Sequence, residues 1–203
     1  MADYVSTLAA MQAHNRTRTV DTSDEIWLLE HPPIYTLGLA GKPEHVLDAG
    51  HISLIKVERG GQVTYHGPGQ LVVYLLLGTK DLGYGVKELV RRIEQSIIDL
   101  LAEYEKISFR KTGMPGVYVA LGNADKNSDA KIAAIGLRIA NHATYHGLSL
   151  NVDMDLAPFS RINPCGYEGL AVTQMRSLGI AAKMDAVGEK LVQYLQRNIY
   201  SSQ

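Results

Sequence analysis

Residues 59–74 read RGGQVTYHGPGQLVVY, a glycine-rich stretch that runs directly into an apolar segment. Glycine lets backbone N–H groups approach a ligand closely and permits turns with positive φ. A strand that follows such a loop would hold it rigidly. Two tight turns with incidental polar residues would need no ligand. However, Arg59, Thr64, Tyr65, His66 and Gln70 cluster here, and so many hydrogen-bonding side chains favour a binding loop over residues 59–70.

Common nucleotide-binding motifs do not explain this loop. Arg59 could pair with a phosphate or a carboxylate, but its spacing from the glycines matches no phosphate-loop signature. Gly41 and Lys42 are followed by Pro43 where serine or threonine should stand, and Thr36 occupies the place of the first glycine. A G-x-G-x-x-G fingerprint is also absent. The sequence therefore excludes ATP binding by a P-loop.

Further β-prone and helical segments flank the loop. The β-prone segments are residues 26–29, 34–37, 52–57, 70–77, 116–121, 131–139 and 144–152, with an exposed turn at 123–129. Apolar residues at helical spacing predict an amphipathic helix over 86–104, a second after Asp185 and a third over 4–14. Few strand pairs are separated by a helix. We therefore expect an α+β (α/β two-layer) domain with a mainly antiparallel mixed sheet and covering helices.

Length and composition describe an ordinary globular chain. No linker divides the 203 residues, which predicts one domain over residues 1–203. A net charge of -1 gives no field that would attract nucleic acid or an acidic membrane surface. The start of the chain lacks the features of a signal peptide, and the apolar run 71–77 is shorter than the ~20 residues that span a bilayer. We expect a cytoplasmic monomer with no nucleic-acid or membrane partner.

Cys165 is the only cysteine, which excludes an internal disulfide and a multi-cysteine zinc site. A lone thiol is commonly a buried small hydrophobe, but Pro164 and Gly166 place this one in a turn, which favours a presented, reactive thiol. His142 and His146 have the spacing of helical zinc ligands within a β-prone segment. On a strand they would lie roughly 13 Å apart. We expect no metal site and no bound cofactor.

Lys131 opens the apolar segment 131–139. A lysine at the start of a buried strand is unfavourable unless it faces a polar site. Alternatively, the lysine is solvated and merely follows the turn at 123–129. The residues alone leave both interpretations open.

Four blocks of the chain resemble one family. Residues 59–74 resemble the signature of lipoyl(octanoyl) transferases, the octanoyl-carrier-protein:protein octanoyltransferases. Residues 131–136, 146–152 and 162–166 are similar to that family's later blocks, in the same order. One departure is Asp129, where family members often have glycine; it affects the geometry of the turn rather than the chemistry.

The resemblance implies the fold of the catalytic domain shared by biotin and lipoate protein ligases. It implies octanoyl transfer from octanoyl-acyl carrier protein to a lysine of a lipoyl domain in 2-oxoacid dehydrogenases or of the glycine cleavage H protein, the first step of endogenous protein lipoylation. Cys165 would be the acyl-thioester nucleophile, and Lys131 would favour its thiolate and assist proton transfer. The residues implied to line the acyl-substrate pocket are Arg59, Gly60, Gly61, Gln62, Val63, Thr64, Tyr65, His66, Ala134, Ile135, Gly136, Gly147, Leu148 and Ser149.

This chemistry suits the residue types. A thiolate attacks a thioester readily and leaves readily. An ammonium about 4 Å from it contributes on the order of 4 kcal/mol at an effective dielectric constant near 20. The base for the acceptor lysine stays open between Lys131, His66 and His146, and Leu71, Ile135 and Leu148 suit either an acyl tunnel or plain core.

Alternative functions are an ATP-dependent lipoate or biotin ligase of the same fold, an octanoyl amidotransferase acting between lipoyl domains, and a non-catalytic binder of acyl carrier protein. A cysteine hydrolase is weakly supported, because no Cys–His family signature is present.

Overall fold

A computed structural model describes residues 1–80, 82–121 and 129–201. Its centre is a six-stranded sheet of order β1-β5-β9-β8-β7-β6, in which every neighbouring pair is antiparallel. The strands are β1 (Glu25–Leu29), β5 (Gln70–Leu76), β6 (Ser108–Lys111), β7 (Met114–Ala120), β8 (Asp129–Ala140) and β9 (Ala143–Asn151). Of the turn predicted over 123–129, residues 123–128 lie outside the described residues.

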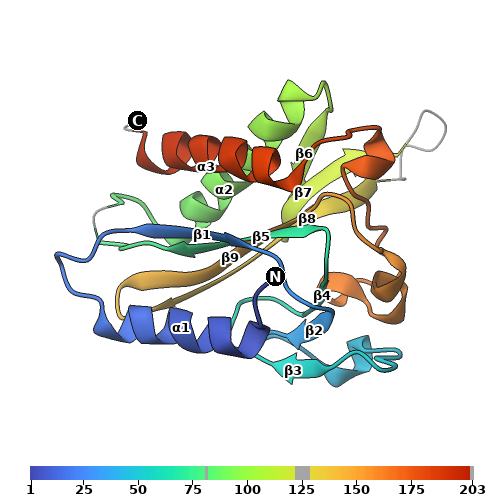
Figure 1. Ribbon diagram of the computed structural model, residues 1–203, viewed down its shortest axis with the longest axis horizontal. Coiled ribbons are helices and arrows are strands. Elements are labelled where there is room, and N and C mark those ends of the chain that lie inside the picture. Colours follow the sequence, from blue (N-terminus) through green and yellow to red (C-terminus); the bar gives the residue numbers. More distant parts are fainter. Residues whose placement is uncertain (81, 122–128, 202–203) are drawn as a thin grey trace.

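A smaller sheet of order β3-β2-β4 lies beside the large one (Figure 1). It contains β2 (Ile34–Leu37), β3 (Leu54–Lys56) and β4 (Val63–His66). β2 pairs with β3 in parallel and with β4 in antiparallel orientation. The predicted α+β class with a mainly antiparallel mixed sheet is therefore confirmed.

Helices cover both faces of the large sheet (Figure 1). α2 (Val86–Glu103) and α3 (Met184–Tyr200) lie together on one face, and α1 (Tyr4–Thr17) lies on the other, next to the small sheet. All three predicted helices form. Within the described residues, no helix is long and apolar enough to cross a membrane.

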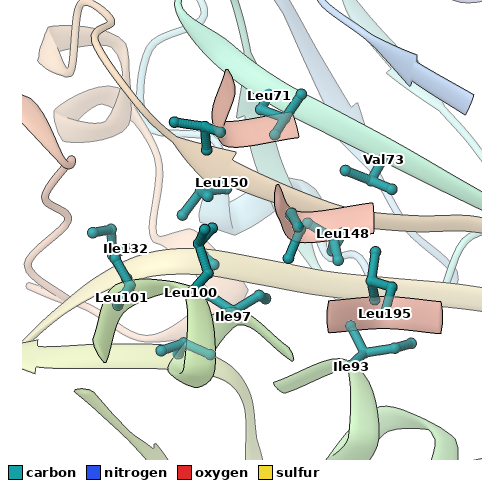
Figure 2. Packing of buried hydrophobic residues seen from close by; sticks show 14 of the residues in the cluster. Leu71, Val73, Ile93, Ile97, Leu100, Leu101, Ile132, Leu148, Leu150 and Leu195 are labelled. Atoms are coloured by element: carbon teal, nitrogen blue, oxygen red, sulfur yellow. The ribbon is translucent and has the colours of Figure 1, made fainter. Parts of the chain in front are cut away.

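The main core fills the space between the large sheet and the α2–α3 pair. Leu148 and Leu150 of β9 face Ile93, Ile97 and Leu100 of α2 there (Figure 2). A second cluster, which includes Tyr35, Tyr65 and Phe159, lies under the small sheet. The apolar face that the helical periodicity predicted for α2 is therefore the face that packs in the core.

The structure differs from the sequence-based prediction in two segments. The expected continuous loop over 59–70 contains strand β4, because Val63 and Tyr65 are buried while β4 pairs with β2. Strand β6 was not expected at all. It lies at the edge of the large sheet, where its residues are only half-buried, so its hydrophobic pattern is weak.

Leu150 provides a test of the main core. Its side chain is fully buried, so Leu150→Ala should lower the free energy of unfolding by about 2–5 kcal/mol. Leu39→Ala, at an exposed leucine, should change it by under about 0.5 kcal/mol. Urea unfolding followed by circular dichroism measures both. Equal losses in the two variants would contradict this account of the core.

Candidate active site

A β-bulge aims Lys131 away from the main core. The β7–β8 register shifts by one residue, because Val117 pairs with Ala133 while Tyr118 pairs with Lys131. Successive side chains of a regular strand point to opposite faces. Ile132 and Ala133 nevertheless both lie in the main core, so the extra residue reverses the alternation. Lys131 consequently points to the other face, where Cys165 lies.

Cys165 sits in a strained turn. The residue has φ 58° and ψ 16°, a left-handed conformation that costs a non-glycine residue about 1–2 kcal/mol. Gly166, with φ 79°, continues it. The turn is held by hydrogen bonds from the Asn163 N–H to the His45 carbonyl (2.8 Å) and from the Gly166 N–H to the Asn163 carbonyl (2.9 Å). Pro164 is buried beside them, while Cys165 is half-buried.

The chain after Cys165 returns along β8 and fixes the two side chains relative to each other. The Lys131 N–H donates to the Ala171 carbonyl (2.8 Å), and the Thr173 N–H donates to the Lys131 carbonyl (2.9 Å). This short parallel pairing joins the segment that follows the cysteine turn directly to the backbone of the lysine. The turn and the bulge therefore belong to one rigid unit.

Within this unit, Lys131 Nζ lies 2.9 Å from Cys165 Sγ. Nζ also donates to the Pro115 carbonyl oxygen (3.0 Å), and it lies 5.1 Å from the centre of the Tyr118 ring. Burial by itself would lower the pKa of Lys131, but charge interaction and hydrogen bonding with Cys165, with help from Tyr118, raise it. The lysine is therefore an ammonium ion next to the sulfur at neutral pH.

A pocket opens beside Cys165, between the two sheets. It is lined by Tyr4, Arg59, Gly61, Gln62, Val63, Thr64, His66, Val72, Tyr74, Ala134, Ile135, Gly136, His146, Gly147, Leu148, Ser149 and Cys165. Gly136 and Gly147 pair across β8 and β9, so this part of the wall has no side chains. A Cβ at Gly147 would lie 2.1 Å from the Val73 carbonyl oxygen, and a Cβ at Gly136 would lie 3.0 Å from the Gly60 carbonyl oxygen, so the two glycines allow the backbone around the pocket to pack closely.

A second, larger groove meets the pocket at Cys165. It runs past Gly60 and Gln62 to Val86 and Val90 of α2 and to Tyr167. Lys131 also lines this groove. The sulfur thus stands where the pocket joins the groove, an arrangement that suits transfer of a bound chain between two partners that arrive from outside.

Most of the residues implied by the resemblance come together. Twelve of the fourteen implied pocket residues line the pocket, Gly60 lines the groove, and Ile135 and Leu148 line the pocket while also contributing to the main core. Tyr65 lies elsewhere: it packs against Tyr35 and Phe159, because adjacent residues of β4 point to opposite faces. Leu71 packs in the main core.

Three residues that line the pocket were not predicted from the sequence. Val72 and Tyr74 lie in the predicted strand 70–77, and their shared alternation could have placed them on one face. Tyr4 comes from α1, and only the docking of that helix brings it to the pocket. Local patterns carry no signal for such a long-range contact.

Buried hydrogen bonds fix the histidine tautomers in the pocket wall. The amide nitrogen of Gln70 donates to the Tyr65 carbonyl and to Asn151, so its oxygen accepts from His66 Nδ1 at 2.7 Å. His31 Nδ1 donates to the Ala2 carbonyl, and its Nε2 accepts from the Tyr74 hydroxyl at 2.7 Å. His31 and His66 are therefore neutral rings whose protons sit on Nδ1.

Arg59 supplies buried positive charge to this wall. Its guanidinium donates to the hydroxyl and carbonyl of Thr36 and to the carbonyl of Gly60. Burial, followed by the positive charge of Arg59, lowers the pKa of His146 to about 3. Burial also lowers the pKa of His66 to about 3; its bond to Gln70 opposes the shift and Arg59 reinforces it. Neither histidine carries charge at neutral pH.

The described residues contain no group of three or more histidine, cysteine or acidic side chains that could hold a metal ion. His146 lies within β9, as the strand interpretation predicted, but His142 lies in the β8–β9 turn rather than on the strand. Both adopt positive φ.

Comparisons with known proteins identify the family of this chain. The family model "Lipoyl protein ligase A/B catalytic domain" matches residues 3–196. An octanoyltransferase of Laribacter hongkongensis is 57% identical over 98% of this chain and 92% of its own length. An octanoyltransferase of Chromobacterium violaceum is 55% identical over 98% and 93%. The chain belongs to the octanoyltransferase family. It is an acyltransferase, and octanoyl transfer in protein lipoylation is the activity of its family.

Solved structures support the fold of this octanoyltransferase. A bipartite lipoate protein ligase from Thermoplasma acidophilum superimposes with a TM-score of 0.76 at 16% identity, over 96% of this chain and 78% of that one. A biotin protein ligase from Aquifex aeolicus gives 0.55 at 17% identity, over 81% and 69%. The expected biotin/lipoate protein ligase fold is confirmed.

Gly116 provides a test of how Lys131 is positioned. A Cβ at Gly116 would lie 2.5 Å from the Ala133 carbonyl oxygen and 3.3 Å from Lys131 Cε, at a φ of 130°. Gly116→Ala should displace the ammonium and slow alkylation of Cys165 by iodoacetamide at neutral pH about tenfold or more. Gly85→Ala is the control, because nothing lies within 4 Å of its added Cβ. Equal rates in both variants would refute this role of Gly116.

The neutral histidines provide a test by pH. Unfolded histidines bind protons below about pH 6.5, whereas folded His66 and His146 do so only near pH 3. The free energy of unfolding should therefore fall as the pH drops from about 6.5 toward 3, by up to about 1.4 kcal/mol per pH unit for each histidine. His66→Gln should flatten this slope, and His142→Gln, at an exposed residue, should not. Urea unfolding at several pH values measures the slopes.

Proposed function

We propose that this chain transfers an octanoyl group from octanoyl-acyl carrier protein to a lysine of a lipoyl domain, through a thioester on Cys165. The observation that carries the proposal is the 2.9 Å contact between Lys131 Nζ and Cys165 Sγ. That contact lies where the pocket meets the larger groove. The acyl chain would occupy the pocket while the donor and then the acceptor use the groove.

In the first half-reaction, the Cys165 thiolate attacks the thioester carbonyl of the donor. A carbon–sulfur bond forms to Cys165, and the bond to the carrier's sulfur breaks. The leaving thiolate takes a proton from the Lys131 ammonium. The products are an octanoyl-enzyme, a carrier with a free thiol and a neutral Lys131.

Acylation changes what Lys131 can do. The thiolate charge of Cys165 is the main influence that raises the pKa of Lys131, and burial opposes it. A thioester carries no such charge, so burial then favours the neutral amine. Lys131 is thereby left as a base beside the thioester at the moment when an acceptor must lose a proton.

In the second half-reaction, Lys131 takes a proton from the ammonium of the acceptor lysine. The resulting amine attacks the octanoyl thioester, an amide bond forms, and the Cys165 thiolate leaves. The amide nitrogen releases its second proton to solvent. The pair returns to its starting state. We favour Lys131 over His66 and His146 as this base because it already contacts the sulfur, whereas both histidines have a pKa near 3.

An ATP-dependent ligase of the same fold is the main alternative, since one of the structural neighbours is a lipoate protein ligase. A ligase that activates a free acid as an adenylate has no need of a thiolate nucleophile. The ammonium held against Cys165 therefore favours the transferase. Ligation of free octanoate with ATP by the pure protein would favour the ligase instead.

Several features of the protein stay predictions from the sequence. These are its cytoplasmic location, its action as a monomer, the single domain over residues 1–203, and the lipoyl domains of 2-oxoacid dehydrogenases and glycine cleavage H protein as acceptors. The related amidotransferase reaction would use the same thiolate with an octanoylated lipoyl domain as donor. Offering each donor separately to the enzyme distinguishes the two reactions.

Cys165→Ser tests the covalent intermediate. Incubation of the wild-type chain with octanoyl-acyl carrier protein alone should give one octanoyl adduct, and peptide mapping should locate it at Cys165. Cys165→Ser should give no thioester adduct, because the serine hydroxyl is not ionised beside Lys131. Intact-mass spectrometry measures both. An adduct on another residue would disprove the proposed nucleophile.

Lys131→Arg separates charge from proton transfer. Arginine keeps the positive charge beside the sulfur, but it does not exchange its proton at neutral pH. Octanoyl-enzyme should still form, while transfer to a lipoyl domain should slow by about 10²–10⁴-fold, the usual contribution of general acid–base catalysis. Lys131→Met should impair both steps. Single-turnover measurements resolve them, and unimpaired transfer by Lys131→Arg would assign the base elsewhere.

A further inference from the structure

His146 enters the pocket through a strained backbone. Its φ is 60° inside β9, and the β5–β9 ladder stops at the Tyr74–Gly147 pair before it resumes at Gly78–Ala143. Adjacent side chains on a regular strand point to opposite faces. Here the rings of Tyr145 and His146 stack 5.0 Å apart on the same face. The left-handed residue has turned its imidazole into the pocket, and such strain is typical of functional positions.

The imidazole has no hydrogen-bond partner there. His146 is 1% exposed, and within the described part of the chain neither of its ring nitrogens is hydrogen-bonded. The Tyr4 hydroxyl also lacks a hydrogen-bond partner among the described residues. Tyr4 is 2% exposed, and its hydroxyl lies near Tyr74 and Thr36 without hydrogen-bond geometry to either. By contrast, His31 and His66 in the same wall are hydrogen-bonded.

His146 lies at the end of the pocket away from the sulfur, and Tyr4 lines the same pocket. Cys165 shares a small cavity with Ala134 and Ser149, which pair across β8 and β9. His146 pairs with Leu137, three residues farther along both strands. Three residues of strand span roughly 10 Å. An extended eight-carbon chain bound to Cys165 has about that length, so its methyl end would reach the level of His146.

We propose that His146 and Tyr4 hold ordered water in the part of the pocket around His146 and thereby limit the length of the acyl chain; this rests on the proposed function of the pocket. A neutral imidazole offers one donor and one acceptor, and a phenol offers both, so the pair suits a bridging water. Buried water usually satisfies polar groups of this kind. Displacing it with an apolar group loses affinity.

Two opposing effects on binding determine the longest acyl chain that the pocket accepts. Each further methylene that is buried among apolar atoms strengthens binding roughly fourfold. A methylene that expels the water instead leaves a buried polar group unsatisfied, which weakens binding roughly five- to 150-fold. For chains of up to eight carbons, each methylene therefore strengthens binding. A longer chain binds more weakly, because its end displaces the water held by the polar groups.

The test compares octanoyl- and decanoyl-acyl carrier protein as donors for acyl-enzyme formation by the full chain. Tyr4→Phe removes one oxygen and keeps the ring, and it should raise the decanoyl-to-octanoyl ratio of kcat/KM about fivefold or more. His146→Leu should raise the ratio further. His146→Asn is the matched control, because asparagine is polar and accepts left-handed φ; its ratio should stay within about threefold of wild type.

Two results would overturn the proposal. One is a ratio in Tyr4→Phe and His146→Leu that equals the wild-type ratio. The other is an equal rise in His146→Asn and His146→Leu, which would show that size rather than polarity sets the limit. Thermal unfolding checks that each variant is folded, and Tyr4→Phe keeps the test decisive if His146→Leu does not fold.

Calorimetric binding of free octanoate and decanoate to the same variants separates this inference from the proposed function. If Cys165 forms no acyl-enzyme but wild type prefers octanoate and Tyr4→Phe does not, the transfer mechanism fails and the length limit holds. If the acyl-enzyme forms in all variants with one unchanged ratio, the mechanism holds and the length limit fails.

Discussion

The contact between the Lys131 ammonium and the Cys165 sulfur is the interaction on which the rest of the site depends. Burial of an ammonium is unfavourable unless it is paired and hydrogen-bonded. Here the sulfur, the Pro115 carbonyl and the face of Tyr118 surround it. Pro115 and Tyr118 belong to β7 and the sulfur to a distant turn, so the fold must bring a strand, its neighbour and that turn to one point.

The backbone around this contact is fixed by its own hydrogen bonds. The Gly116 N–H donates to the Glu94 carboxylate of α2 at 2.9 Å, and Glu94 also pairs with Arg110 at 3.2 Å. α2 therefore supports the strand whose Pro115 carbonyl faces the ammonium. The strained residues of the site, Cys165 and His146, likewise lie next to paired strands and buried turns, which is how a fold maintains unfavourable backbone conformations.

Much of this arrangement could be predicted from the sequence. The helix over 86–104 followed from its apolar periodicity, and the turn at Cys165 followed from Pro164 and Gly166. The orientation of Lys131 could not be predicted, because it depends on the pairing of β8 with β7, and a strand pattern does not reveal a bulge. Tyr4 was missed for a similar reason. Its role arises only from the docking of α1, whose sequence pattern shows nothing of the pocket.

The bulge at Ile132 has a consequence for how related chains are compared. Deleting Ile132 would restore regular pairing, because Lys131 could still pair with Tyr118 and Ala133 with Val117. The lysine would then directly precede Ala133, which lies in the main core, so its side chain would still point to the opposite face, where Cys165 lies. A gap of one position at Ile132 in an alignment with a related chain therefore removes a buried isoleucine from the core but leaves the orientation of the lysine unchanged.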